Sequence, residues 1–173
     1  MLELERTYLV KTVPADLGSV PCFELTDTYY PAESEHPVLR LRTKAGKLEL
    51  TKKQPAQEGD SSQMIEQTIE LSPEEYAVLE AVPGRRVSKI RYEYPYKGLV
   101  AEFDVFQEAL SGLVLVDFEF STPEEKDRFE MPEFCLAEVT QEQFIAGGML
   151  CGKVYADISE RLAKFAYAPL SLP

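Results

Sequence analysis

The chain has 173 residues, 45% of them hydrophobic, and this size and composition predict one domain over residues 1–173 with a substantial buried core. Its formal net charge of −12 argues against a general binder of nucleic acid or of acidic membranes, because no basic field would attract a polyanion from a distance. No apolar run is long enough to span a bilayer, and Glu3 and Glu5 stand where a signal peptide needs positive charge, so we expect a cytoplasmic protein.

The cysteine and histidine content excludes several kinds of site. Cys22, Cys135 and Cys151 are odd in number and far apart in sequence, which favours reduced thiols over a disulfide framework or a zinc site with paired ligands. The single histidine, His36, argues against a His-dependent catalytic triad and against a metal site with several histidines. We interpret the three cysteines as core or incidental residues.

Residues 1–10 are predicted to form a strand in which two acids share one face and two leucines share the other, since successive side chains point to opposite faces. Two carboxylates held side by side repel each other unless a cation lies between them. The same pattern of two like charges flanking one residue recurs down the chain. The five pairs are Glu3/Glu5, Arg40/Arg42, Lys89/Arg91, Glu102/Asp104 and Asp117/Glu119.

Any one of these pairs is typical of an ordinary antiparallel sheet with one wet face. Such a face normally mixes charges of both signs with Thr, Ser and Gln, because opposite charges on neighbouring strands stabilise a sheet and like charges destabilise it. Five pairs that are each uniform in sign instead indicate a specialised charged surface.

The strands that follow the first are predicted to be largely antiparallel, as the short turns between them indicate. They lie at 22–30, 38–43, 47–53, 64–71, 86–94, 99–106, 113–121 and 136–139. Ala45-Gly46 is the turn of a hairpin between the third and fourth strands. Residues 54–62 are polar and rich in turn-forming residues, so we expect a mobile loop there.

Three helices are predicted from capping sequences, in which a Ser or Thr precedes an acid or Gln by three residues. The caps are Ser72, Thr122 and Thr140. The helix after the third cap is interrupted at Gly147-Gly148, and a closing helix is predicted over residues 153–167. Two of these helices carry apolar stripes, at Tyr76, Leu79 and Val82 and at Val154, Ile158, Leu162 and Phe165.

The predicted fold class is α+β, an eight-stranded antiparallel β-barrel with three or four helices packed outside. Side chains of a barrel strand alternate between lumen and exterior, so apolar positions under the helices would leave all five charged pairs lining a tunnel. Burying so many charges without partners would be very unfavourable. A wet lumen that binds a polyanion through Arg and Lys, and a hard divalent cation such as Mg2+ or Mn2+ through the acids, resolves this cost.

The sequence resembles the CYTH, or triphosphate tunnel metalloenzyme, superfamily in motifs that run in the family's order over nearly the whole chain. The motifs are Glu3-Leu-Glu5-Arg-Thr7, Leu39-Arg-Leu-Arg42, Leu50-Thr-Lys-Lys53, Gly84-Arg-Arg-Val-Ser-Lys-Ile-Arg-Tyr92, Ala101-Glu-Phe-Asp-Val-Phe106, Leu115-Val-Asp-Phe-Glu-Phe120 and Glu138-Val-Thr140. Each motif alone is weak, but the ordered set is highly specific. The resemblance implies an eight-stranded antiparallel tunnel that binds a triphosphate group with a divalent metal ion.

The resemblance also implies roles for individual residues. The metal ligands would be Glu3, Glu5 and Glu119, with Asp117 beside them. The triphosphate cradle would consist of Arg40, Arg42, Lys53, Lys89 and Arg91. Tyr29 is similar in place to a tyrosine that some members use near the scissile phosphate together with the strand-end lysine, here Lys53; a plain strand aromatic is the alternative. Glu102 and Asp104 would face the lumen as metal or water ligands or as salt-bridge partners of the cradle.

Three departures from the family pattern reduce the charge expected inside the tunnel. Thr7 stands where the family has a lysine, so one phosphate contact is absent. Thr68 stands where a second acid is expected after Glu66, and a Tyr-x-Asn type element expected near Phe144-Ile-Ala146 is missing. We expect these changes to shift the substrate, slow the chemistry or abolish it.

Known members of the family include inorganic triphosphatases, thiamine triphosphatases, class IV adenylyl cyclases and RNA triphosphatases. The leading hypothesis is therefore a metal-dependent hydrolase of tripolyphosphate, a nucleoside triphosphate or thiamine triphosphate, in which Glu5 or Glu119 orients the attacking water. The alternatives are a class IV-type adenylyl cyclase, a catalytically weak triphosphate- or polyphosphate-binding module, and a structural barrel whose charges only pair with each other. A homodimer would be in keeping with the family.

Overall fold

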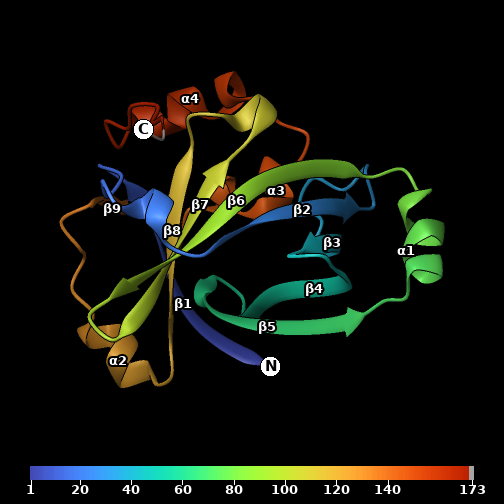
Figure 1. Cartoon of the computed structure of the whole chain (residues 1–173), viewed down its shortest axis with the longest axis horizontal. Helices are drawn as coiled ribbons and strands as arrows, with labels where there is room; N and C mark the ends of the chain where they lie inside the picture. The colour runs from blue at the N-terminus through green and yellow to red at the C-terminus, as the bar shows by residue number, and fades with distance from the viewer. Residues whose placement is uncertain (172–173) are drawn as a thin grey trace.

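The alternating strands of the sequence fold into a closed barrel, seen in the computed structural model, which describes residues 1–171 (Figure 1). The last two residues of the predicted domain 1–173 lie outside this range. The strands are β1 (Leu2–Val10), β2 (Cys22–Tyr30), β3 (Leu39–Lys44), β4 (Lys47–Gln57), β5 (Asp60–Glu70), β6 (Arg85–Tyr96), β7 (Leu99–Phe106), β8 (Val114–Phe120) and β9 (Cys135–Glu138). The helices are α1 (Pro73–Glu80), α2 (Pro123–Arg128), α3 (Gly147–Leu150) and α4 (Tyr155–Ala163), with short 3-10 helices η1 (Leu17–Ser19), η2 (Glu108–Leu110) and η3 (Gln143–Ile145).

Eight of these strands follow one another around the barrel in the order β1-β8-β7-β6-β2-β3-β4-β5, and every neighbouring pair is antiparallel. β5 returns to β1 to close the ring, with residues 2–4 opposite residues 63–65. β9 pairs with the C-terminal end of β1, beyond this seam. The predicted α+β fold, with an eight-stranded antiparallel barrel and helices outside, is confirmed.

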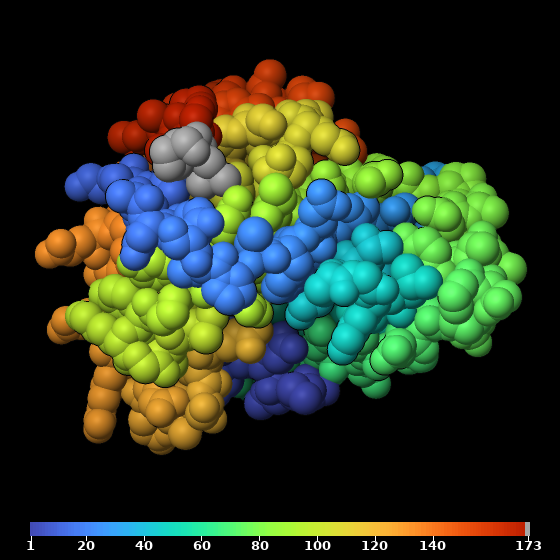
Figure 2. Space-filling view, viewed as in Figure 1, coloured from blue at the N-terminus to red at the C-terminus, as the bar shows by residue number. Residues whose placement is uncertain are grey.

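Apolar side chains on the outer face of the barrel make up much of the core. One cluster lies outside β1, β7 and β8, where Tyr8, Phe103 and Phe118 are fully buried and pack with Phe129 and Phe134. A second cluster lies where α4 packs against one end of the barrel (Figure 1). On the face seen in Figure 2, β2 and β3, coloured blue to cyan, reach the surface without a helix over them. The helices therefore cover only part of the outer face of the barrel.

The closing helix is shorter than predicted and buries two of the four residues of its predicted stripe. α4 holds Ile158 and Leu162 in the second cluster, 4% and 1% exposed. Val154 precedes the helix and is 46% exposed, and Phe165 follows it and is partly buried against the same cluster. No helix within residues 1–171 combines the length and the apolar character needed to cross a membrane.

The first helix forms as predicted but packs less than its stripe suggested. Ser72 caps α1 in a complete capping box, with its hydroxyl accepting from the backbone of Glu75 and the Glu75 carboxylate accepting from the backbone of Ser72. No residue of α1 is buried, and Val82 lies beyond its end, 49% exposed. α1 thus lies over one edge of the barrel, and local hydrogen bonds stabilise it more than burial does.

Residues 54–62 belong to a hairpin, so the prediction of a mobile loop there was wrong. β4 and β5 run through this stretch and turn at Gly59, whose φ of 84° favours glycine. The tip is held from elsewhere in the chain: the Gln141 side chain accepts from the Ser61 backbone N–H at 3.0 Å and donates to Asp60 at 3.1 Å. Because these partners are distant in sequence, local composition gave no sign of them.

Thr140 does not begin a helix, so that prediction was also wrong. Its hydroxyl oxygen accepts a hydrogen bond at 3.1 Å from the backbone N–H of Thr7 in β1, and it is therefore not free to cap a turn. The chain continues as the 3-10 helix η3 and the single turn of α3, with Ala146 between them in an extended conformation. Pairing with β1 outweighs the local capping signal.

Candidate active site

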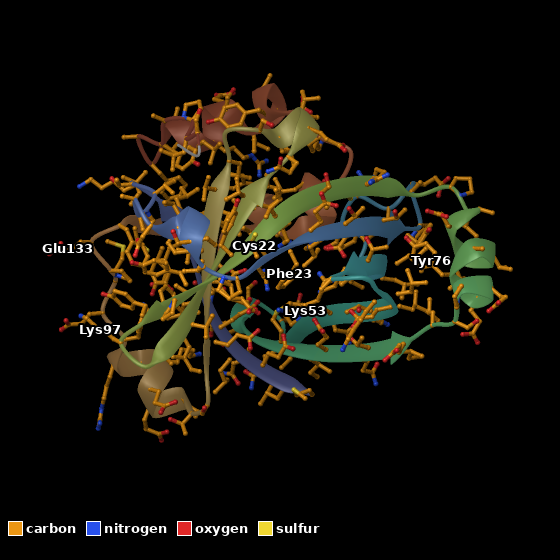
Figure 3. All side chains as sticks on the ribbon, in the orientation of Figure 1. Cys22, Phe23, Lys53, Tyr76, Lys97 and Glu133 are labelled. Atoms are coloured by element: carbon orange, nitrogen blue, oxygen red, sulfur yellow. The ribbon has the colours of Figure 1, made fainter. Side chains whose placement is uncertain are left out.

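The barrel encloses a cavity of about 260 Å³, and all eight barrel strands contribute side chains to its wall. Every residue that the sequence singled out as a site candidate lies on this wall. These residues are Glu3, Glu5, Tyr29, Arg40, Arg42, Lys53, Lys89, Arg91, Glu102, Asp104, Asp117 and Glu119. Figure 3 shows Lys53 among the barrel strands, whereas Lys97 and Glu133 lie at the outer edge of the molecule. Strand alternation therefore collects residues from seven strands in one space.

Four of these residues, on β6 and β7, form a group that we call the paired cluster: Lys89, Arg91, Glu102 and Asp104. Arg91 stands opposite Asp104 and donates to it at 2.7 and 2.6 Å. Arg91 also donates to Glu102, and Lys89 donates to Asp104. Burial favours a higher pKa for Asp104, but Arg91 and Lys89 outweigh it and hold that pKa far below its ordinary value. Two cations and two carboxylates balance each other here.

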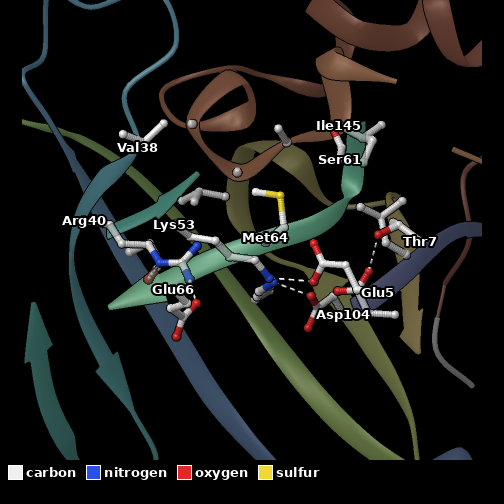
Figure 4. A pocket seen from close by; sticks show the side chains of 18 of the residues that line it. Glu5, Thr7, Val38, Arg40, Lys53, Ser61, Met64, Glu66, Asp104 and Ile145 are labelled. Atoms are coloured by element: carbon white, nitrogen blue, oxygen red, sulfur yellow. Dashed lines mark hydrogen bonds and ion pairs between the residues drawn. The ribbon is translucent and has the colours of Figure 1, made fainter. Parts of the chain in front are cut away.

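A second group, on β1, β4 and β8, is the acid-rich cluster: Glu3, Glu5, Lys53 and Glu119. Glu5 and Glu119 are direct partners in the register of β1 and β8. The Lys53 ammonium lies 3.0 Å from Glu3 and 2.5 Å from Glu5 (Figure 4). Burial and the neighbouring carboxylates raise the pKa of Glu5 and of Glu119, although Lys53 opposes this. Three carboxylates thus lie near one ammonium, which pairs with Glu3 and Glu5.

The acid-rich cluster has the chemistry of a site for a hard cation. Carboxylate oxygens are the ligands that magnesium, manganese and calcium prefer. Like charges directly opposite on neighbouring strands destabilise a sheet, and a bound cation would remove that cost. In the part of the chain that the structure describes, no three acid, His or Cys side chains are already gathered as a metal site, and Lys53 stands between Glu3 and Glu5. The donor set fits a divalent ion, and the ammonium is its competitor.

Thr7 and Asp117 connect the two clusters. Thr7 Oγ1 donates to Asp117 at 2.7 Å, and Asp117 lies 3.3 Å from Arg91 of the paired cluster. Asp117 is also one of the charges that raise the pKa of Glu5 in the acid-rich cluster. Where the family pattern has a lysine, this chain therefore has a neutral hydroxyl that donates a hydrogen bond to a carboxylate.

Arg40 is held by a hydroxyl and an acid from two other strands. Its Nη1 donates to Tyr29 Oη and its Nη2 to Glu66, each at 3.1 Å. Its Nε is buried and, within residues 1–171, makes no hydrogen bond, with Asp27 lying 3.9 Å away. Burial raises the pKa of Tyr29, although Arg40 opposes this, so the hydroxyl is neutral. A buried guanidinium N–H without a partner is a donor that a phosphoryl oxygen would satisfy.

Asp27 and Glu66 also line the cavity, but the sequence analysis gave neither a role in the site, although Glu66 matched an acid of the family pattern. Asp27 accepts from Arg42 at 2.7 and 2.9 Å, and both side chains are buried. Burial favours a higher pKa for Asp27, but Arg40 and Arg42 lower it. Glu66 binds Arg40 and also accepts from Thr68 at 3.0 Å. Neither acid has a like charge two residues away, so the search for charged pairs passed over them, although strand alternation places both inward.

Tyr29 and Lys53 are not joined in this structure. Among the residues described, Tyr29 Oη is bonded to Arg40 on β3, whereas Lys53 on β4 reaches across to the acids of β1 (Figure 4). Both side chains line the same cavity, so a substrate between them would contact both. Their joint role stays a prediction.

Comparison with known proteins identifies the family. Residues 1–133 match the CYTH domain, and the chain belongs to the CYTH family, as its motifs predicted. An inorganic triphosphatase of Nitrosomonas europaea is 34% identical over 146 residues, which cover 83% of this chain and 92% of that protein. The crystal structure of an inorganic triphosphatase aligns with 88% of this chain and 95% of its own, at 28% identity and a TM-score of 0.63. A candidate adenylate cyclase from Bacillus halodurans, 15% identical over 99% of this chain and 93% of its own, shares the fold with a TM-score of 0.54.

Proposed function

We propose that this protein is a divalent-metal-dependent hydrolase that removes the terminal phosphate from tripolyphosphate or from an organic triphosphate. The observation that carries the proposal is the cavity itself, where guanidinium and ammonium groups from three strands line the same small space as an excess of carboxylates. Membership of the CYTH family and the similarity to an inorganic triphosphatase support it. The preference for tripolyphosphate or an organic triphosphate is left to the assay below.

The cationic side chains of the cavity fall into two groups. One group pairs with carboxylates of the wall, and we assign the other to the substrate. Lys89 and Arg91 are engaged by the carboxylates of the paired cluster, so we propose that they form a rigid, charge-balanced part of the cavity wall. Arg40 has a buried Nε–H that makes no hydrogen bond within residues 1–171, and Lys53 is shared between two acids that would also bind a metal ion. We therefore assign Arg40 and Lys53 the direct contacts to phosphoryl oxygens, with Arg42 behind Arg40 on the same strand.

A divalent ion, Mg2+ or Mn2+, would be held by Glu3, Glu5, Asp117 and Glu119. When bound, it would neutralise charge on the phosphoryl oxygens. Glu5 and Glu119 face each other across β1 and β8 in the cavity, so either carboxylate could orient the attacking water. Either acid can fill this role, and the two are separated by the test that follows.

The test is phosphate release from tripolyphosphate, ATP and thiamine triphosphate, with Mg2+ and then with Mn2+. We compare wild type with Glu5→Gln and Glu119→Gln, and with Glu133→Gln as the matched control on the outside of the molecule (Figure 3). We expect turnover that is lost in one or both cavity variants and kept in the control. Tight triphosphate binding without phosphate release from any substrate would refute the hydrolase and leave a binding module, or a cyclase detected by its cyclic product.

Three further statements stay predictions: a cytoplasmic location, a single domain over residues 1–173, and a homodimer. The absence of nucleic acid and membranes among the partners is likewise predicted from the net charge of −12. Size-exclusion chromatography with light scattering of the purified chain would settle the number of subunits.

A further inference from the structure

One end of the cavity is closed by apolar side chains and by the C-terminal segment. Val87, Phe106 and Leu115 stand on the inward faces of β6, β7 and β8 beyond the charged residues, and Ile145 of η3 meets them in the same cluster. Gly147 and Gly148, at the start of α3, also line the cavity. A polyanion has no partner among the apolar groups, so it must end where this wall begins.

Two glycines bring this wall into direct contact with the site. A Cβ built on Gly147 would lie closer than 3.0 Å to Tyr29 Oη, and one on Gly148 closer than 3.0 Å to the backbone oxygen of Pro37. Separations this short do not occur for real Cβ atoms. Neither glycine has a positive φ, so the requirement for glycine comes from space alone.

The contact at Gly147 acts on a side chain that has little room to move. Tyr29 is 3% exposed, and its hydroxyl accepts from Arg40 Nη1 at 3.1 Å. Glu66 holds the other end of the same guanidinium at 3.1 Å. The third nitrogen of the guanidinium, Nε, is buried and makes no hydrogen bond with any residue of the range 1–171. The position of Gly147 therefore limits where the Tyr29 hydroxyl can lie. The hydroxyl in turn limits the position of the Arg40 guanidinium and of its Nε–H group.

We propose that Gly147 is a positioning residue that seats Tyr29 against Arg40 and so sets how deeply the terminal phosphoryl group of the substrate enters the cavity. The substrate then enters end first, and the organic part of an organic triphosphate stays on the far side of the charged residues. This inference rests on the proposed triphosphate site, but its structural half can be tested without any turnover.

The structural half is tested by 19F NMR of the chain labelled with fluorotyrosine. The chain has nine tyrosines, and the resonance that disappears in Tyr29→Phe is that of Tyr29. We expect Gly147→Ala to shift this resonance. Gly18→Ala is the matched control, because Gly18 has a negative φ and no atom within 4 Å of its added Cβ. An unmoved Tyr29 resonance in a folded Gly147→Ala variant overturns the proposal, whether or not the wild type is an enzyme.

The functional half is tested with steady-state kinetics on tripolyphosphate. We expect Gly147→Ala to lower kcat by about 10- to 100-fold, because misplacing a reacting group by about 1 Å has effects of that size. KM should change much less, since Lys53 still binds the rest of the chain of phosphates. Gly18→Ala should match the wild type.

The decisive variant combines Gly147→Ala with Tyr29→Phe. Removing the hydroxyl oxygen leaves Tyr29 Cζ as the nearest atom, 3.1 Å from the added Cβ, which a small shift accommodates. The double variant should therefore fold even if Gly147→Ala alone does not, and should have the kcat of Tyr29→Phe alone. Independent, multiplying losses in kcat would overturn the proposal. If the wild type released no phosphate, the proposed function would be refuted. The NMR result would still show whether Gly147 positions Tyr29.

Discussion

The two ion clusters of the cavity are built from the same residue types but differ in balance. In the paired cluster, Arg91 and Lys89 face Glu102 and Asp104, and the pKa of Asp104 is held far below its ordinary value. In the acid-rich cluster, three carboxylates face Lys53 alone, and the pKa of Glu5 is raised. The opposite directions of these shifts separate the two functions that we assign: the first cluster is complete as it stands, and the second needs another cation.

The largest effect on stability should come from breaking the paired cluster. Asp104→Asn leaves Arg91 with Glu102 and Asp117 and removes the carboxylate that pairs with Lys89, and the loss of one partner of a buried ion pair typically costs about 3–5 kcal/mol in the free energy of unfolding. Urea denaturation measures this loss against Glu133→Gln. A variant as stable as the wild type would mean that the cluster is not the scaffold we describe.

The largest effect on activity should come from the acid-rich cluster. Lys53→Gln removes a cation that we assign to a phosphoryl oxygen, and removal of one such donor lowers kcat by about 100-fold or more. Lys52→Gln is the matched control, because Lys52 is an exposed neighbour on the same strand. If both variants lost the same activity, net charge and not position would explain the effect.

The pH dependence of stability should distinguish the clusters. Glu5 and Glu119 have folded-state pKa values above the ordinary 4.5, so their protonation stabilises the fold fully below 4.5, and this contribution is lost as the pH rises through the raised values. With EDTA present, the free energy of unfolding from urea titrations should therefore be higher near pH 5 than at pH 7. Glu119→Gln should flatten this slope, and an unchanged slope would contradict the proposed repulsion.

The same comparison can be sharpened with metal. At pH 7 a divalent ion would replace the protons that the acid-rich cluster lacks, so Mg2+ or Mn2+ should raise the melting temperature of the wild type. Glu119→Gln should reduce this rise, whereas Glu133→Gln should keep it. Differential scanning fluorimetry over a range of metal concentrations provides the measurement. An equal rise in all three proteins would place the ion elsewhere.

The smallest effect should come from the residue that links the clusters. Thr7→Val removes one hydrogen bond of 2.7 Å to Asp117, and a bond to a charged group contributes about 1.5–3 kcal/mol at most to stability. Because Asp117 keeps its contact with Arg91, we expect the lower end of that range in urea denaturation. Thr7→Ser, which keeps the hydroxyl, should restore the stability of the wild type. A serine variant as unstable as the valine variant would assign the effect to packing.

Local sequence signals predicted the strands well and the connections less well. Glu3 and Glu5 were placed on one inward face because alternation is a property of any extended strand. Alternation could not predict the hairpin at residues 54–62 or the pairing of Thr140 with β1. In both places a bond to a distant segment, from Gln141 in one case and Thr7 in the other, replaces the structure that local composition favours.

The sequence by itself determined which residues face the lumen, because two residues on one strand keep the same face whatever that strand pairs with. Only the tertiary structure decided which charges meet. Glu5 lies opposite Glu119 because the closed ring sets the register between β1 and β8, which are far apart in the chain. The contact between Gly147 and Tyr29 is of the same kind, since it depends on where the C-terminal segment crosses the end of the barrel.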